Sequence, residues 1–183
     1  VQRLVLAVIV AELELDTDSI CAALLHDTLE DCKDKTNVET IKSLFGNEVA
    51  ELVEGLTKLP VVFFEDKEEA SIENTRKLFL AMNHDIRVIF IKFADRLHNM
   101  RTVEALSRER QEALANETLE IYSRLASRLG LSYMKCEMED ICLKVLHPEA
   151  YDDLVREVSL KRAERQEIVD RLCAELQTMM KEH

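Results

Sequence analysis

Glycine, proline and tryptophan are scarce in this sequence. Its 183 residues include 3 glycines, 2 prolines and no tryptophan. A sheet-rich protein of this length needs turn-forming residues at short intervals, and these counts are too low to supply them. We therefore predict an all-α protein whose long helices are joined by few breaks. Hydrophobic residues make up 47% and charged residues 33% of the chain, which is typical of a globular protein.

Basic charge and long apolar runs are also lacking. Lys and Arg number 24 against 36 Asp and Glu, so the formal net charge is -12. General nucleic-acid binding requires a basic surface, and we expect none here. The apolar run from Leu4 to Ala11 is far shorter than the roughly 20 residues that cross a bilayer, so we expect no membrane association. An acidic protein that acts on a phosphorylated small molecule would need local cations or a metal.

Cysteine pairs at metal-binding spacing are absent. The 5 cysteines are an odd number, and no two of them are separated by two residues; they are Cys21, Cys32, Cys136, Cys142 and Cys173. This pattern favours neither a zinc cluster nor a disulfide framework. We predict buried, reduced thiols in a cytoplasmic protein.

Apolar residues at helical spacing fill most of the chain. They predict helices at about 2–13, from 19 through His26 toward Glu30, and at 36–45, 48–59, 71–82, 86–101, 108–129 and 132–146. Residues 60–70 are expected to form a loop, and the charged segment from Tyr151 onward a further helix. We predict one principal helical domain over residues 1–148 and a C-terminal helical arm over 149–183.

The segment LLHDTLED at residues 24–31 gathers an imidazole and three carboxylates. On a helix, His26 and Glu30 are neighbours at positions i and i+4, and so are Asp27 and Asp31. Such a group is costly in an ordinary core. Nitrogen and oxygen donors are suited to a divalent cation, so the segment predicts part of a metal site.

A second polar group follows the apolar segment 86–93. Asp95, Asn99 and Thr102 lie at positions i, i+4 and i+7, which places them on one stripe of a helix that is otherwise expected to be buried. Polar groups in such a place need partners.

Two interpretations of this stripe are open. Asp95 could form an ion pair with Arg96 or Arg101 inside the bundle. Alternatively, Asp95 completes the metal site, and Asn99 and Thr102 line a substrate pocket.

Five segments together resemble successive motifs of the RelA/SpoT family. They occur in the family's order and extend over about residues 13–148: AALLHDTLED, FGNEVAELVEGLTKL, ENTRKLFLAM, DIRVIFIKFADRLHNMRT and ETLEIYSRLASRLGL. The resemblance is to the N-terminal hydrolase domain, and it implies an HD-domain helical bundle. It also implies Mn²⁺-dependent removal of the 3′-pyrophosphate from guanosine tetra- and pentaphosphate, (p)ppGpp, giving GDP or GTP and pyrophosphate. The C-terminal arm resembles the connection to a synthetase domain in longer members.

The resemblance implies three sets of site residues, namely metal ligands, carboxylates that activate and orient the attacking water, and residues near the substrate. In that order they are His26, Asp27 and Asp95; Glu30 and Asp31; and Asn99, Arg101 and Thr102. The cation would offset the local carboxylates where the pyrophosphate lies, helped by Lys92, Arg96 or Arg101.

The sequence departs from the family pattern at several positions. The family has a further metal-binding His followed by Pro, and in the family's register Gln2 and Arg3 occupy these positions. Gln is a poor replacement for imidazole, so the metal site is expected to be one ligand short. The family's basic pair that holds guanine falls before Val1. Cys32 stands where the family commonly has Thr, and Ser127 where it has His.

Two other functions remain open. The first is a degenerate HD domain that has a regulatory or binding role beside a (p)ppGpp synthetase domain. The second is a hydrolase of other nucleotides, against which the segment ADRLHNMRT argues. Position 2 separates the enzyme from the regulatory domain, since a His there favours hydrolysis and a Gln favours regulation.

Overall fold

The computed structural model describes residues 2–32, 36–58 and 85–181. These residues form helices and no β-strand, so the predicted all-α class is confirmed. The elements are α1 (Gln2–Glu12), α2 (Thr17–Leu25), α3 (Thr28–Asp31), α4 (Val38–Phe45), α5 (Asn47–Lys58), α7 (Ile86–Arg101), the 3₁₀ helix η1 (Val103–Ala105), α8 (Arg108–Glu117), the π-helical segment η2 (Thr118–Ser123), α9 (Arg124–Leu129), α10 (Ser132–Leu146) and α11 (Pro148–Lys181). The predicted loop at 60–70 and helix at 71–82 lie outside the described residues.

Local sequence explains where several helices begin and end. The carboxylate of Asp85 accepts the backbone N–H of Arg87 at 2.8 Å and caps α7. Two glycines stop helices: Gly46 after α4 and Gly130 after α9, with φ values of 95° and 74° that other residues rarely adopt. The helices expected at 36–45 and 108–129 end at these glycines.

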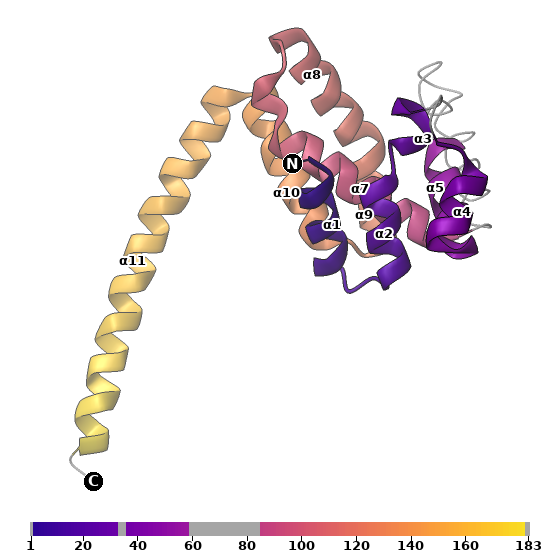
Figure 1. Cartoon of the computed structure of the whole chain (residues 1–183). Helices are drawn as coiled ribbons and strands as arrows, with labels where there is room; N and C mark the ends of the chain where they lie inside the picture. The colour runs from indigo at the N-terminus through magenta and orange to yellow at the C-terminus, as the bar shows by residue number, and fades with distance from the viewer. Residues whose placement is uncertain (1, 33–35, 59–84, 182–183) are drawn as a thin grey trace.

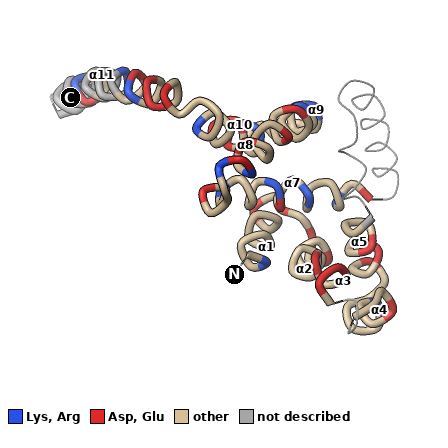
Figure 2. The backbone as a smooth tube through the Cα atoms, turned by 90° about the horizontal axis from the view of Figure 1, so that it is seen from above, with Lys and Arg blue, Asp and Glu red and all other residues tan. Residues whose placement is uncertain are grey.

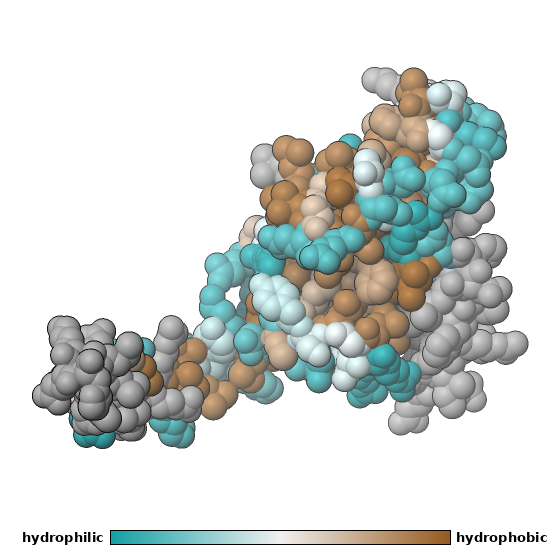
Figure 3. All heavy atoms as spheres, turned by 90° about the horizontal axis from the view of Figure 1, so that it is seen from below, coloured by the Kyte–Doolittle hydropathy of each residue, from teal (hydrophilic) through white to brown (hydrophobic). Residues whose placement is uncertain are grey.

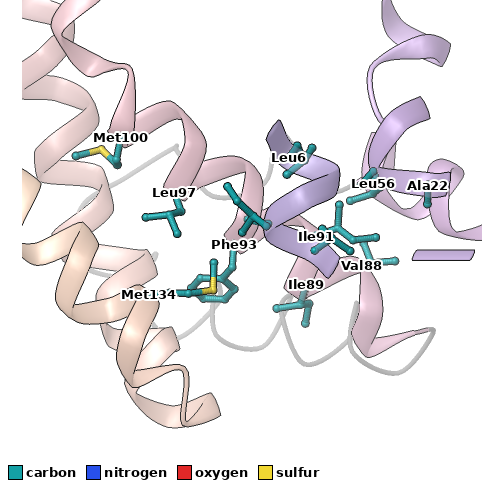
Figure 4. Close-up of a cluster of buried hydrophobic side chains, with 14 of the residues drawn as sticks. Leu6, Ala22, Leu56, Val88, Ile89, Ile91, Phe93, Leu97, Met100 and Met134 are labelled. Carbon is teal, nitrogen blue, oxygen red and sulfur yellow. The ribbon is translucent and has the colours of Figure 1, made fainter. Parts of the chain in front are cut away.

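Helix α7 is the centre of the bundle. It contacts α1, α2 and α5 on one side and α10 on the other (Figure 1). Side chains from α1, α5 and α10, among them Leu6, Leu56 and Met134, gather around its apolar residues (Figure 4). Phe93 of α7 is 2% exposed and meets Tyr122 edge to face, with ring centroids 5.6 Å apart. The apolar segment of α7 therefore forms much of the core, and the polar residues that follow it are held on a rigid element.

Helix α11 projects away from the bundle (Figure 1). It is 34 residues long, begins at Pro148 and packs near its start on α10. Its apolar residues Leu154, Val155, Val158 and Val169 are exposed. Apolar side chains also reach the surface of the bundle itself, as Figure 3 shows. The division of the chain into a domain and an arm at residue 148 stays a prediction.

Two expectations about side chains and membranes can be compared with the described residues. The prediction of buried thiols is wrong for Cys136 and Cys173, which are exposed, whereas Cys142 is buried. Cysteine spacing carries no information about which face of a helix points to solvent, and Cys136 lies on the outer face of α10. No helix among residues 2–32, 36–58 and 85–181 is both long enough and apolar enough to cross a membrane.

An ion-pair group fastens the beginning of α7 to its neighbours. The guanidinium of Arg87 lies 2.5 Å from Asp85, 2.6 Å from Asp16 and 2.7 Å from Glu48. Hydrogen bonds from Arg87 hold the pKa of Asp85 below its ordinary value of 3.8. A carboxyl whose pKa is lowered in the folded state stabilises the fold above its unfolded pKa, and this contribution is lost as the pH falls through the lower, folded value.

We expect Arg87→Met to lower the free energy of unfolding by about 1–2 kcal/mol at neutral pH, because charged hydrogen bonds are lost from a partly exposed group. The variant should also lose less stability than the parent as the pH falls below about 4, since the pKa of Asp85 returns toward its ordinary value. Urea unfolding between pH 2 and 7 measures both effects. Arg108→Met is the control, because Arg108 pairs with Glu112 on the surface of a single helix. Parallel pH profiles for parent and Arg87→Met would contradict the assignment.

Candidate metal and nucleotide site

The chain bends between His26 and Asp27, where a continuous helix was expected. Helix α2 ends at Leu25, and Asp27 has φ -93° and ψ 0°, outside the helical range. The carbonyl of Asp27 accepts the backbone N–H groups of Glu30 and Asp31 at 3.1 and 2.8 Å and starts the short helix α3. The carboxylate of Asp27 makes no capping hydrogen bond to α3 and lies against His26 instead. The prediction of one helix through these residues is therefore wrong, and its four polar side chains do not share a helix face.

The bend turns Asp27 back onto His26. Nε2 of His26 lies 2.8 Å from Oδ2 of Asp27. The other ring nitrogen, Nδ1, lies 2.8 Å from the carbonyl oxygen of Ala23. Because a carbonyl only accepts hydrogen bonds, Nδ1 donates to Ala23, and Nε2 is the ring nitrogen that remains to bind a metal ion. The backbone thus orients a buried imidazole so that Nε2 faces a carboxylate.

Asp95 of α7 completes this group. Its Oδ1 lies 4.0 Å from Nε2 of His26, although the two residues are far apart in the sequence. The alternative ion pairs of Asp95 are not formed, since Arg96 pairs with Glu117 and Arg101 with Glu137. The structure therefore brings His26, Asp27 and Asp95 together.

Negative charge is crowded at this point. Partial burial raises the pKa of Asp27, while the neighbouring His26 lowers it; the carboxylates of Asp95 and Asp31 raise it further. A carboxylate whose ionised form is disfavoured by its neighbours gains most from a nearby cation. The electrostatics of the group thus favour a bound positive charge.

The carboxylates of α3 lie at the exposed edge of the group. Glu30 and Asp31 are both exposed, and Figure 2 shows the acidic residues of α3 in red. Asp31 pairs with Arg3 of α1, whose Nη2 lies 2.8 Å from Oδ2. No sequence motif predicts this pair, because Arg3 departs from the family pattern.

The beginning of α1 also reaches Asn99. Nε2 of Gln2 donates to Oδ1 of Asn99 at 3.3 Å, and Nδ2 of Asn99 lies 3.4 Å from Oδ1 of Asp95. The residue at the expected first ligand position is thus connected to the group through Asn99. This arrangement is consistent with the register that we assigned to Gln2.

The remaining predicted substrate residues point elsewhere. Thr102 ends α7, is exposed, and donates its hydroxyl to the carbonyl of His98 at 3.1 Å. Arg101 binds Glu137 of α10 through two hydrogen bonds of 2.6 and 2.8 Å. Arg101 also lines a pocket of about 380 Å³, which has none of the other predicted site residues in its lining. The structure places Asn99 at the group of His26 and does not bring Arg101 there.

The side chains of His26, Asp27 and Asp95 carry donor atoms of the types that bind divalent cations. One imidazole nitrogen and two carboxylates are a common set for ions that accept both nitrogen and oxygen. Within the part of the chain that the structure describes, no three His, Cys, Asp or Glu side chains are already arranged to hold a metal ion. His26, Asp27 and Asp95 are gathered but not disposed around a common centre.

Comparisons with known proteins identify the family of this chain. A family model described as HD domain matches residues 2–132. A guanosine-3′,5′-bis(diphosphate) 3′-pyrophosphohydrolase of Haemophilus influenzae is 44% identical over 174 residues, which are 95% of this chain and 25% of the relative. The bifunctional (p)ppGpp synthase/hydrolase SpoT of Escherichia coli (strain K12) is 44% identical over 176 residues, 96% of this chain and 25% of the relative. A GTP pyrophosphokinase of Myxococcus xanthus is 43% identical over 94% of this chain and 23% of the relative. The chain spans about a quarter of the length of these relatives.

Proposed function

The chain belongs to the HD domain family and is an HD domain of the RelA/SpoT type, and from this we propose that it hydrolyses guanosine tetra- and pentaphosphate. The proposed reaction removes the 3′-pyrophosphate and gives GDP or GTP. The observation that carries the proposal is the convergence of His26, Asp27 and Asp95 from two segments that are distant in sequence. HD hydrolases depend on a metal, and we propose Mn²⁺ as the cation of this site.

The proposed site residues would have three different roles. Nε2 of His26 and the carboxylates of Asp27 and Asp95 would hold the cation. When bound, such a cation lowers the pKa of water and offsets the charge of a pyrophosphate. Glu30 or Asp31 would take the proton of the attacking water as it adds to the phosphorus on the 3′ oxygen. The bond between this phosphorus and the ribose 3′ oxygen would break, pyrophosphate would leave carrying the oxygen of the water, and the 3′ oxygen would take a proton from solvent and become a hydroxyl. Asn99 is proposed to lie near the nucleoside, and Arg101 and Thr102 would do so only where the nucleoside extends beyond the group of His26.

A degenerate, regulatory HD domain is the second candidate, and one observation favours it. Gln2 occupies the expected position of a metal ligand, and its amide is engaged with Asn99. A site with one ligand fewer should hold Mn²⁺ less firmly. The arm 149–183 is proposed to join the domain to a further domain, such as a synthetase, because the relatives are about four times longer than the matched region. A cytoplasmic location is likewise proposed.

A Gln2→His variant decides between the two candidates. We expect the parent to bind Mn²⁺ weakly and turn over little, and the variant to bind it at least about 10-fold more tightly, because an imidazole is a far better ligand than an amide. Calorimetry measures the binding, and release of pyrophosphate from ppGpp measures the activity. Gln2→Leu is the control, since it removes the hydrogen bond to Asn99 without adding a ligand.

The outcomes are distinct. Restored binding and hydrolysis would identify a hydrolase that is disabled at one ligand. Firm Mn²⁺ binding without hydrolysis, in a chain extended by the upstream basic residues, would identify the regulatory domain. Release of phosphate or pyrophosphate from other nucleotides at an equal rate would contradict the proposed substrate.

A further inference from the structure

Arg96 is a buried charge one residue after Asp95. Its side chain was predicted to be one of the cations near the pyrophosphate, but it is only 10% exposed and turns into the bundle. There it pairs with Glu117, and its guanidinium carbon lies 4.2 Å from the centre of the Tyr122 ring. A buried arginine with a carboxylate on one side and an aromatic ring on another is fixed in place. This position is incompatible with direct contact to a substrate phosphate.

The π-helical segment explains how both partners reach Arg96. Glu117 and Tyr122 are five residues apart, and in an α-helix their side chains would point about 140° apart. A π-helix has more residues per turn and bonds residue i to residue i+5, so side chains five residues apart point closer together than in an α-helix. Segment η2 covers Thr118–Ser123 and directly follows Glu117. The wide turn is thus placed where it presents Glu117 and Tyr122 together to α7.

Rotation of α7 about its axis sets the direction of Asp95. Successive residues of a helix point about 100° apart, so Asp95 faces His26 while Arg96 faces η2. A rotation of about 15° would move an atom 6 Å from the axis by roughly 1.5 Å. Oδ1 of Asp95 is 4.0 Å from Nε2 of His26, so a shift of this size would decide whether both atoms can bind the same cation.

We propose that Arg96, held by Glu117 and Tyr122, is a positioning residue that fixes the rotation of α7 and thereby directs Asp95 toward His26. The link to catalysis rests on the proposed function, but the positioning itself does not. Tyr122 also meets Phe93 one turn earlier on α7, so η2 holds this helix at two points.

The test compares Arg96→Lys with Ile41→Ala. Lysine keeps the charge of residue 96 but loses the flat group that stacks on Tyr122. Ile41 is buried on α4, whose main contacts are with α5, so its truncation lowers stability without touching η2. The first measurement is the NMR spectrum of the His26 ring, for which Asp95→Asn shows the change produced by removing the Asp95 charge. The second is the kcat and KM of pyrophosphate release in the Gln2→His background.

We expect Arg96→Lys, under conditions in which it is folded, to shift the His26 ring signals and to lower kcat about 10- to 100-fold with little change in KM. Ile41→Ala should lose stability and leave the His26 signals unchanged. If Arg96→Lys only lowers stability and its His26 signals match the parent's, the positioning role is overturned. If Arg96→Lys does not fold, the His26 ring signals of Glu117→Gln are compared with the parent's instead, and unchanged signals again overturn the positioning role. If the Gln2→His chain releases no pyrophosphate, the proposed function fails and the His26 signals alone decide the positioning role.

Discussion

Replacing Asp95 by alanine is expected to abolish both metal binding and pyrophosphate release. Asp95 is the one member of the group supplied by α7, and its carboxylate faces Nε2 of His26. Without it, only His26 and Asp27 would remain as protein ligands. A bound cation contributes several kcal/mol to charge stabilisation in the transition state, so we expect a loss of about 10³-fold or more in rate. The measurement is Mn²⁺-dependent pyrophosphate release from ppGpp in the Gln2→His background, with calorimetry of Mn²⁺ binding.

The stability of the Asp95→Ala protein shows whether activity is lost through the metal site or through unfolding. Burial is the main cause that raises the pKa of Asp27, and the nearby carboxylate of Asp95 raises it further. Its removal should bring the pKa of Asp27 closer to the ordinary value and leave the metal-free protein about as stable as the parent. Asn99→Ala is a matched control for Mn²⁺ binding, because it removes the neighbouring amide and keeps the carboxylate. An Asp95→Ala protein that is folded and still binds Mn²⁺ as the parent does would exclude the proposed site.

Replacing Glu30 by Gln or Asp31 by Asn is expected to lower the rate by about 10²–10⁴-fold while metal binding is kept. Both carboxylates belong to α3, beside the group of His26, and both are exposed to solvent where a water could be activated. Neither is among the proposed ligands. Substitution should therefore remove a proton acceptor without emptying the metal site.

Asp31 and Glu30 differ in one contact. Asp31 pairs with Arg3, so Asp31→Asn also releases the beginning of α1 from α3. Arg3→Ala releases the same contact and keeps the carboxylate, which makes it the control for Asp31→Asn. Glu39→Gln, on the exposed first turn of α4, is the control for the loss of one negative charge. A fall in Mn²⁺ affinity that parallels the fall in rate would assign these residues to the ligand set instead.

Much of the fold follows from the sequence because helices are decided locally. Scarce glycine and proline, the Asp85 cap and the Gly46 and Gly130 stops depend on residues within a turn of each other. The central place of α7 was predictable too, since a long apolar segment must be buried. The predicted helix was wrong beyond His26. Apolar residues at helical spacing continue there, but the backbone leaves the helical range at Asp27.

The site was only partly determined by the sequence. Motifs indicated which side chains could bind a cation, but the distance between His26 and Asp95 depends on how α2 packs against α7. The same is true of the contact between Gln2 and Asn99 and of the one between Arg3 and Asp31. The spacing of residues along one helix does not specify which residues of another helix they contact, because these contacts depend on the packing of the whole core. Local pattern therefore determined the helices and the chemical kinds of residue, and tertiary packing alone decided that Asp95 meets His26 while Arg96 turns away from it.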